Sequence, residues 1–291
     1  MKLPEFDFVE PDTVAEACAL LADDPEESVA FAGGTDVLVL LRERALRARR
    51  LVSLGKIESL GRIELTQDNG LAIGATVTVN RVARHDGLRA RYPGIVDAAR
   101  SLAADQVRNL ATVAGNLCMA VPSADMAPIL LAHDAKLRAV SPDGERLIPL
   151  REFFVGPRQT VLAPAELVTA IEVPQPRPGQ GGAFARHGGR ASLSLPVASA
   201  AAVVRMDGEI CVEATVALGA VAPTPILVRA VREIVTGRRL TAEVLAEAGA
   251  AARAAAQPID DVRGSAAHRR ELVAVLTGRV LTTAADRAGA A

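Results

Sequence analysis

The sequence predicts an α+β protein in which a larger N-terminal part precedes a smaller C-terminal part. Short apolar segments typical of strands alternate with amphipathic segments typical of helices up to residue 173. A stretch rich in proline and glycine then covers residues 174–182 without any hydrophobic period. Beyond it, two strand patterns joined at Asp207-Gly208 come before a purely helical sequence. The main domain boundary is therefore expected at this proline-rich stretch.

The first 57 residues form one unit in which strands and helices alternate. Thr13 and Glu16 have the spacing of a capping box, in which the Thr side chain accepts from the backbone N–H at the start of a helix. Gly33-Gly34 follows directly after the second strand pattern. The expected order is strand 6–9, helix 13–21, strand 28–32, a glycine loop, helix 37–41 and strand 51–54.

The middle of the chain, residues 58–175, carries more helical sequence. Thr78 is positioned to cap a helix, Tyr92-Pro93 opens another, and Ser123-Ala124-Asp125 offers capping chemistry for a third. Ser141-Pro142-Asp143-Gly144 has the residue types of a hairpin turn. The expected elements are strand 70–75, helices 78–84, 92–102 and 124–131, a hairpin of 136–140 with 145–149, and strand 166–173.

The C-terminal part, residues 183–286, is expected to combine a small antiparallel sheet with a cluster of helices. The predicted strands are 183–187, 197–204 and 209–220, and the predicted helices are 226–235, 241–256 and 265–285. Residues 286–291 are expected to fray because they end the chain with little apolar sequence.

Composition excludes several classes of function. Thirty-three basic and 34 acidic residues leave a net charge of −1, so no overall field draws the chain to nucleic acid or an anionic membrane. No apolar run approaches the roughly 20 residues of a membrane span, and no secretory signal is visible, so a cytoplasmic location is expected. Cys18, Cys118 and Cys211 lie far apart in sequence, which favours free structural thiols over a disulfide or metal site.

Two glycine-containing stretches are the candidates for a binding site. Phe31-Ala32-Gly33-Gly34-Thr35-Asp36 runs from a strand end into adjacent glycines, and Ala111-Thr112-Val113-Ala114-Gly115-Asn116 is similar to it. Adjacent glycines let a backbone approach a ligand closely, and successive free N–H groups can hold an anion. Such a loop alone is often an ordinary turn, but two together have the donors for one pyrophosphate. The sequence contains no nucleotide-binding G-x-G-x-x-G, metal cluster or acid–base constellation, which favours a bound cofactor as the source of the chemistry.

Five blocks in order resemble the flavin-binding (medium) subunits of the molybdenum hydroxylases, the family of xanthine dehydrogenase and carbon monoxide dehydrogenase. These blocks are FDFVEP at the N-terminus, AGGTDVLVLLR at 32–42, ATVAGNLCMAVPSADMAP at 111–128, REFFVGPRQTVLAPAELVTAIEVP at 151–174 and LGAVAPTP at 218–225. The resemblance covers essentially the whole chain. It implies a two-part FAD-binding domain of the vanillyl-alcohol oxidase type over 1–175, with subdomains of about 1–57 and 58–175, and a C-terminal domain over 183–286.

The resemblance also implies a set of residues for non-covalent FAD. Backbone N–H groups of both loops and the Thr35 hydroxyl would hold the pyrophosphate. Asp125 matches an acidic residue that contacts the adenosine ribose, while Leu162 and Arg186 lie in blocks that approach the flavin ring. The implied cofactor-binding set is Ala32, Gly33, Gly34, Thr35, Asp36, Thr112, Val113, Ala114, Gly115, Asn116, Asp125, Leu162 and Arg186. No residue is implied as catalytic or as a metal ligand.

The function implied by the resemblance is electron transfer within a multi-subunit oxidoreductase. An iron–sulfur subunit carrying 2Fe-2S clusters would pass electrons from a large molybdopterin subunit to FAD, which would pass them to NAD, a quinone or oxygen. The assembly would be a heterotrimer or its dimer, and substrate hydroxylation would occur on a partner chain. The cysteine-rich insertion of the benzoyl-CoA-type subunits, which holds an extra iron–sulfur cluster, is absent from this sequence.

One departure from the family pattern concerns Ala114, which replaces the first glycine of the second loop. If this residue needed positive φ or a close phosphate contact, its methyl group would cost about 1 kcal/mol or more. A loss of FAD affinity at Ala114 would leave one alternative open, an assembly subunit that holds its partners without binding FAD. A second alternative, independent of Ala114, is a free-standing flavin oxidoreductase with its own small substrate, as in the wider flavoprotein superfamily.

Overall fold

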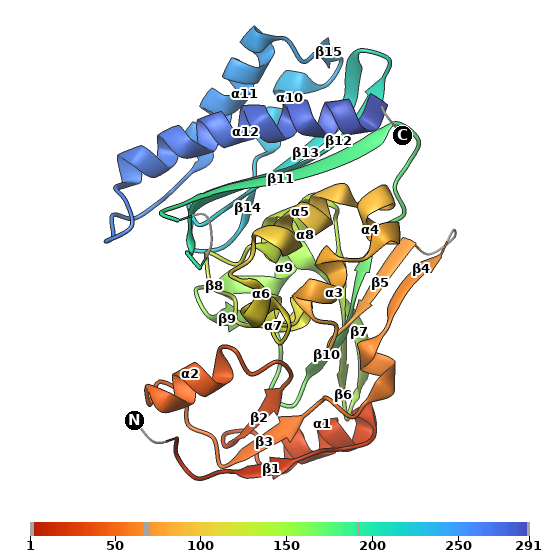
Figure 1. Ribbon diagram of the computed structural model, residues 1–291, viewed down its shortest axis with the longest axis vertical. Coiled ribbons are helices and arrows are strands. Elements are labelled where there is room, and N and C mark those ends of the chain that lie inside the picture. The colour runs from red at the N-terminus through yellow and green to blue at the C-terminus, as the bar shows by residue number, and fades with distance from the viewer. Residues whose placement is uncertain (1–2, 67–69, 191–192, 290–291) are drawn as a thin grey trace.

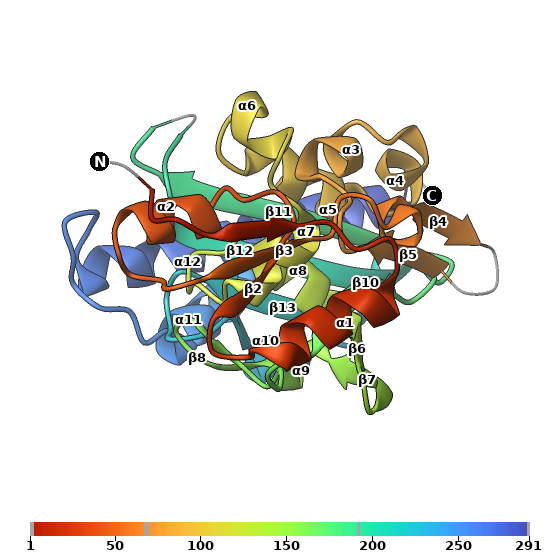
Figure 2. The ribbon, with the colours of Figure 1, turned by 90° about the horizontal axis from the view of Figure 1, so that it is seen from below.

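Within the described residues, three larger β-sheets follow one another along the long axis of the molecule (Figure 1), and a fourth sheet has only two short strands. The computed structural model describes residues 3–66, 70–190 and 193–289. The N-terminal unit lies at one end, the helix-rich middle part in the centre and the C-terminal part at the other end. The elongated α12 covers the outer side of the last sheet (Figures 1 and 2).

The N-terminal unit is a parallel three-stranded sheet with strand order β1-β3-β2. Its elements are β1 (Asp7–Val9), α1 (Val14–Asp23), β2 (Ser28–Phe31), α2 (Val37–Arg42) and β3 (Arg50–Ser53). The Thr13 side chain accepts from the Glu16 N–H at 3.1 Å and the Glu16 carboxylate accepts from the Asp12 N–H, so the expected cap is present. The predicted alternation of this unit is confirmed.

The middle part contains a five-stranded antiparallel sheet with the order β4-β5-β10-β6-β7. Its strands and two short strands beside them are β4 (Ile63–Thr66), β5 (Gly70–Gly74), β6 (Lys136–Ser141), β7 (Gly144–Pro149), β8 (Phe154–Gly156), β9 (Gln159–Thr160) and β10 (Leu167–Val173). Its helices are η1 (Glu58–Gly61), α3 (Val79–Ala83), α4 (Asp86–Arg91), α5 (Pro93–Ser101), α6 (Asp105–Arg108), α7 (Val113–Cys118), α8 (Met126–Ala132) and α9 (Leu150–Phe153). The expected hairpin and strands are present. The elements of this part that the sequence did not predict are all short and carry little periodicity: η1, β4, α4, α6, α7, α9, β8 and β9.

The C-terminal sheet has the order β11-β12-β13-β14, with β15 paired to β13. Its elements are β11 (Gln180–Gly188), β12 (Pro196–Asp207), β13 (Ile210–Gly219), β14 (Ile226–Leu227), α10 (Arg229–Val235), β15 (Arg238–Arg239), α11 (Ala242–Ala255) and α12 (Ala266–Gly289). Alternate residues of β12 face opposite ways: Ala201 belongs to the large core centred on the middle part, and Ala200 and Ala202 belong to the core under the C-terminal helices. Burial on both faces explains why this strand reads as a nearly continuous apolar run.

Four boundaries differ from the sequence prediction. The proline-rich stretch ends at Gly179, since residues 180–182 already pair with β12. The hairpin turn is Gly208-Glu209, because Asp207 pairs with Ile210. Residues 226–227 form a strand before the helix begins at Arg229.

The fourth difference is at the end of the chain, where fraying was expected. Helix α12 continues to Gly289, because Arg287 donates to both Asp97 carboxylate oxygens on α5 and to the Gly182 carbonyl. Long-range contacts of this kind are invisible in local sequence patterns. Residues 290–291 lie outside the described residues.

Candidate functional site

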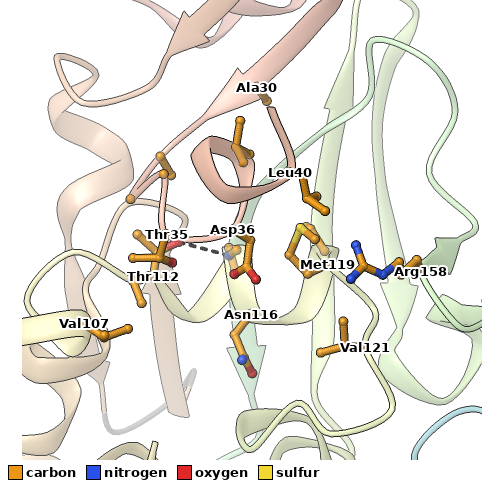
Figure 3. Close-up of a pocket in the computed structure, with 18 of the residues that line it drawn as sticks. Ala30, Thr35, Asp36, Leu40, Val107, Thr112, Asn116, Met119, Val121 and Arg158 are labelled. Atoms are coloured by element: carbon orange, nitrogen blue, oxygen red, sulfur yellow. Dashed lines mark hydrogen bonds between the residues drawn. The ribbon is translucent and has the colours of Figure 1, made fainter. Parts of the chain in front are cut away.

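A cavity of about 770 Å³ opens between the N-terminal unit, the middle part and the loop after β11 (Figure 3). Its lining comes from the two glycine-containing stretches, from the β8–β9 turn and from residues 193–195. Figure 3 shows Thr35 and Thr112 on one side of it and Arg158 on the other. The volume is within the range of cofactor and ligand pockets in general.

Most of the residues that the sequence analysis selected lie around this one cavity. Every residue from Ala32 to Asp36 lines it, together with Thr112, Ala114, Gly115, Asn116, Asp125 and Leu162. Val113 does not, because its side chain is fully buried in the core and its N–H donates to the Val77 carbonyl. Arg186 does not line the cavity itself, but it forms an ion pair with Asp125, which does.

The two stretches touch each other at Gly33. A Cβ atom added to Gly33 would lie 1.9 Å from the Leu110 carbonyl oxygen and 3.1 Å from the Ala111 Cα. No larger residue fits there without moving one backbone away from the other. Gly33 thereby makes a single binding surface from segments that are about eighty residues apart in sequence.

Gly34 lets the first stretch turn between β2 and α2. Its φ of +69° is a left-handed conformation that side chains rarely adopt, and an added Cβ would also meet the ring of Phe31 at 2.4 Å. Among the described residues, no backbone N–H from Gly33 to Asp36 has a hydrogen-bond acceptor. Consecutive free donors on the wall of a cavity are suited to an anionic ligand.

The second stretch is the start of a helix, whereas the sequence analysis described it as a loop. Thr112 is the N-cap of α7, and its hydroxyl oxygen accepts from the Gly115 N–H at 3.0 Å (Figure 3, dashed line). A bridge between Thr112 and Thr78 fixes this cap to the start of α3. The Gly115 N–H is therefore occupied by the cap, and the Ala114 N–H in the first turn has no intrahelical acceptor.

Ala114 has helical backbone geometry within α7 and does not belong to the residues with positive φ. Its side chain is buried, with an exposed fraction of 4%. Alanine is the residue best suited to a helix interior. A left-handed backbone was one of the two possible reasons for the Ala114 methyl group to cost binding or folding free energy, and the helical backbone removes that reason.

Asn116 joins the second stretch to the next helix. Its side-chain Oδ1 accepts from the Met126 N–H at 3.2 Å, which satisfies a donor at the start of α8. Ser123 and Asp125 were expected to supply this cap from their position in the sequence, but Asp125 makes no side-chain cap bond in the structure. The cap comes instead from ten residues earlier in the chain, so the Asp125 carboxylate is available for other contacts.

Asp125 and Arg186 form a buried ion pair between the middle and C-terminal parts. An Arg186 nitrogen lies 2.8 Å from Asp125 Oδ2, and both side chains are more than nine-tenths buried. Arg186 also donates to the Ser194 carbonyl at 2.9 Å, at the rim of the cavity. Burial raises the pKa of the Asp125 carboxyl to about 6, although the Arg186 charge acts in the opposite direction.

The second carboxylate oxygen, Asp125 Oδ1, is buried without a hydrogen-bond partner. Unsatisfied buried oxygens are rare, because each costs about 1–3 kcal/mol. Asp125 also lines the cavity. A ligand hydroxyl would supply the missing donor, which fits the ribose contact that the sequence resemblance implies.

Several lining residues were given no role from the sequence. Met119, Val121 and Arg158 lie within the motif blocks of the resemblance but outside both glycine-containing stretches, and Leu195 lies outside the blocks as well. Their place at the cavity is visible only in the tertiary structure. Cys118 also lines it, and burial raises the pKa of its thiol to about 12, so it stays protonated. Within the described ranges, no group of three His, Cys, Asp or Glu side chains is arranged to hold a metal ion.

The residues of this site fit FAD on three observations: free N–H groups along the first stretch, a glycine cradle that a Cβ would fill, and an unpartnered carboxylate oxygen. In the part of the chain that the structure describes, no helix is both long and apolar enough to cross a membrane.

Comparisons with known protein families point to the same cofactor. Residues 4–176 match the family model of the FAD binding domain in molybdopterin dehydrogenase, and residues 184–284 match the CO dehydrogenase flavoprotein C-terminal domain.

Individual relatives are similar along nearly their whole length. The putative xanthine dehydrogenase FAD-binding subunit of Escherichia coli K12 is 32% identical, with 95% of each chain covered. The carbon monoxide dehydrogenase medium chain of Afipia carboxidovorans is 31% identical, over 97% of this chain and 98% of that one.

Solved structures agree with these relatives. A chain of Cu,Mo-CO dehydrogenase superposes with a TM-score of 0.94 at 30% identity, covering 99% of this chain and 100% of that one. A chain of quinoline 2-oxidoreductase from Pseudomonas putida 86 gives 0.93 at 29% identity, covering 99% of both.

Proposed function

The chain belongs to the family of FAD-binding domains in molybdopterin dehydrogenases, and on that premise we propose that it is the FAD-carrying, electron-transferring subunit of a multi-subunit molybdenum hydroxylase. The observation that carries the proposal is the cavity in which both glycine-containing stretches and Asp125 meet. The expected cytoplasmic location remains part of the proposal.

We propose that the first stretch holds the FAD pyrophosphate through the N–H groups of residues 33–36 and the Thr35 hydroxyl. In the second stretch, the Ala114 N–H is the free donor, while Thr112 and Gly115 fix its position through the cap. Asp125 receives a ribose hydroxyl at its unpartnered oxygen, and Arg186 holds the Asp125 carboxylate in place. Leu162 supplies apolar lining.

Bound FAD supplies the redox chemistry, accepting electrons from an iron–sulfur subunit and delivering them to an external acceptor. The chain's own residues bind and orient the cofactor and exclude water from it. The names of the relatives support partner subunits, because those relatives are named as a subunit or a medium chain of dehydrogenases, and the matching family model is that of molybdopterin dehydrogenases. We propose that the partners are a subunit carrying 2Fe-2S clusters and a large molybdopterin subunit. Hydroxylation of the organic substrate is then the task of a partner chain.

We also propose the domain limits 1–175 and 183–286, with a division of the first near residue 57. Two hydrophobic cores support them: a small one around Leu41, Ala48 and Leu51 lies within the first 57 residues, and another under the C-terminal helices contains only residues from 183 onward. The large core is centred on the middle part but also takes in residues of the other two parts, among them Ala17 and Ala201. The matches of the two family models, at 4–176 and 184–284, lie close to these limits.

The test is purification of the full chain, followed by its visible spectrum and a titration with FAD. We expect a yellow protein whose flavin is released on denaturation and identified as FAD. A colourless chain that takes up no FAD at high concentration would contradict the proposal and favour the assembly subunit. Size-exclusion of the protein purified from its natural source tests whether it has partner subunits, and we expect it to elute together with them. Elution as an active flavoenzyme without other subunits would favour the free-standing oxidoreductase.

A further inference from the structure

The charge inside the cavity is unusual for a site that is to receive a pyrophosphate. Among the described lining residues, Arg158 is the only basic one, whereas Asp36, Asp125 and Glu166 are acidic. Asp125 is paired with Arg186, and Glu166 is paired with Arg146. Asp36 remains as an unpaired carboxylate within the first stretch, next to the N–H groups that would hold the phosphates.

A free carboxylate beside a doubly charged pyrophosphate is unfavourable unless a positive charge lies nearby. Burial raises the pKa of the Asp36 carboxyl above its ordinary value, although the neighbouring Arg158 charge acts in the opposite direction. The two side chains nevertheless form no ion pair within 4 Å. Figure 3 shows the Arg158 side chain directed toward Met119 and Asp36 from the opposite wall of the cavity. The Arg158 guanidinium therefore faces the cavity without forming an ion pair with Asp36.

The backbone at Arg158 is an independent observation. Its φ is +59°, a left-handed conformation at the turn Gly156-Pro157-Arg158-Gln159. The third position of such a turn normally carries Gly or Asn, because a larger side chain is strained there. The Arg158 N–H donates to the Ala120 carbonyl at 2.8 Å, and Ala120 itself has a φ of +46°. Strained residues of this kind gather at ligand sites, where the surrounding structure holds them in place.

We propose that Arg158 is the residue that neutralises the charge of the FAD pyrophosphate, contacting its phosphate oxygens across the cavity from residues 33–36. This inference rests on the proposed function, since it needs FAD as the ligand. The N–H groups of the first stretch supply hydrogen bonds but no net charge, and Arg158 supplies the charge. Its guanidinium is suited to this because it donates two parallel hydrogen bonds to phosphate.

The chain offers a matched control for the experiment. Arg44 is also an exposed arginine with a left-handed backbone, at φ +62°, and it does not line the cavity. The variants Arg158→Gly and Arg44→Gly therefore remove the same side chain and relieve the same kind of backbone strain. We expect the melting temperature of both apoproteins to equal or exceed that of the wild type, so a loss of binding would not reflect unfolding.

The measurement is the dissociation constant for FAD and, in parallel, for riboflavin, which has the same ring without phosphates. We expect Arg158→Gly and Arg158→Gln to weaken FAD about ten- to hundredfold, the loss typical of one charged hydrogen-bonded contact. Riboflavin binding should be unchanged, Arg158→Lys should recover part of the FAD affinity, and Arg44→Gly should leave both ligands unaffected. Added salt should weaken FAD binding less in Arg158→Gln than in the wild type.

Three results would overturn the inference. Equal FAD affinity for Arg158→Gly and Arg44→Gly would show that Arg158 makes no contact, while FAD binding by the wild type leaves the proposed function intact. Equal losses for FAD and riboflavin would show that Arg158 acts on the ring or the fold and not on phosphate. Failure of the wild type to bind FAD would refute the proposed function and this inference together.

Discussion

The contact at Gly33 gives the sharpest test of how the site is built. In Gly33→Ala the new Cβ would start 1.9 Å from the Leu110 carbonyl oxygen. Both atoms belong to backbone or are fixed to it, so no flexible side chain can absorb the overlap. One of the two stretches must retreat by about 1 Å or more, at a cost of roughly 1–3 kcal/mol of folding free energy.

The same retreat would separate the donors of the first stretch from those of the second. If one charged hydrogen bond to a phosphate is lost, the cost is about 1.5–3 kcal/mol, which corresponds to roughly a ten- to hundredfold weaker FAD complex. The assays are FAD titration of the full chain and chemical denaturation of the apoprotein. Gly33→Ala should lower both the FAD affinity and the free energy of unfolding, because the same contact with Leu110 determines both.

Gly55→Ala is the matched control. A Cβ there would lie 3.6 Å from the Ser53 hydroxyl oxygen, an ordinary van der Waals distance. We expect wild-type FAD affinity for this variant. If Gly33→Ala also bound FAD like the wild type, the two stretches would not form a joint site, and the reasoning from the Leu110 contact would fail.

Three further predictions concern Ala114, Asp125 and His133. Because Ala114 is helical and buried in α7, Ala114→Gly should destabilise the chain by about 0.5–1 kcal/mol and leave FAD affinity nearly unchanged; a large gain in affinity on titration would instead indicate that the site has decayed. The folded pKa of Asp125, about 6, lies above its ordinary value of 3.8, so its contribution to stability is complete below pH 3.8 and is lost as pH rises through 6. This effect amounts to a change in the free energy of unfolding on the order of 3 kcal/mol between pH 4 and pH 7. Denaturation curves of Asp125→Asn should lack this change, and a pH profile equal to that of the wild type would contradict the assignment to Asp125. For His133, burial lowers the pKa to about 4 from 6.5, so stability present above pH 6.5 is lost as pH falls toward 4. The pH dependence of stability due to His133 has the opposite sign to that due to Asp125, so the two are best separated in the Asp125→Asn background. There, His133→Gln should flatten the curve of unfolding free energy against pH. If stability is still lost at low pH in the double variant, a group other than His133 is responsible.

Local sequence patterns were sufficient where one segment decides its own structure. The Thr13 cap, the alternation of the first unit and the hairpin around residues 141–144 all follow from side chains within a few positions. Patterns failed where a partner from elsewhere in the chain decided the outcome. Asn116 rather than Asp125 caps α8, and Asp97 together with the Gly182 carbonyl keeps α12 ordered through Arg287.

The same division holds for the site. The sequence by itself determined which stretch carries adjacent glycines and, through the order of five motif blocks, the family and its cofactor. It did not show that Gly33 is a glycine because the Leu110 carbonyl packs on it, that Ala114 is helical, or that Arg158 faces Asp36 across the cavity. Those facts depend on which backbones and charges meet in space. Contacts such as those between Gly33 and Leu110 or between Asp36 and Arg158 join residues far apart in the chain and leave no local periodicity in a single sequence, so only the tertiary structure decided them.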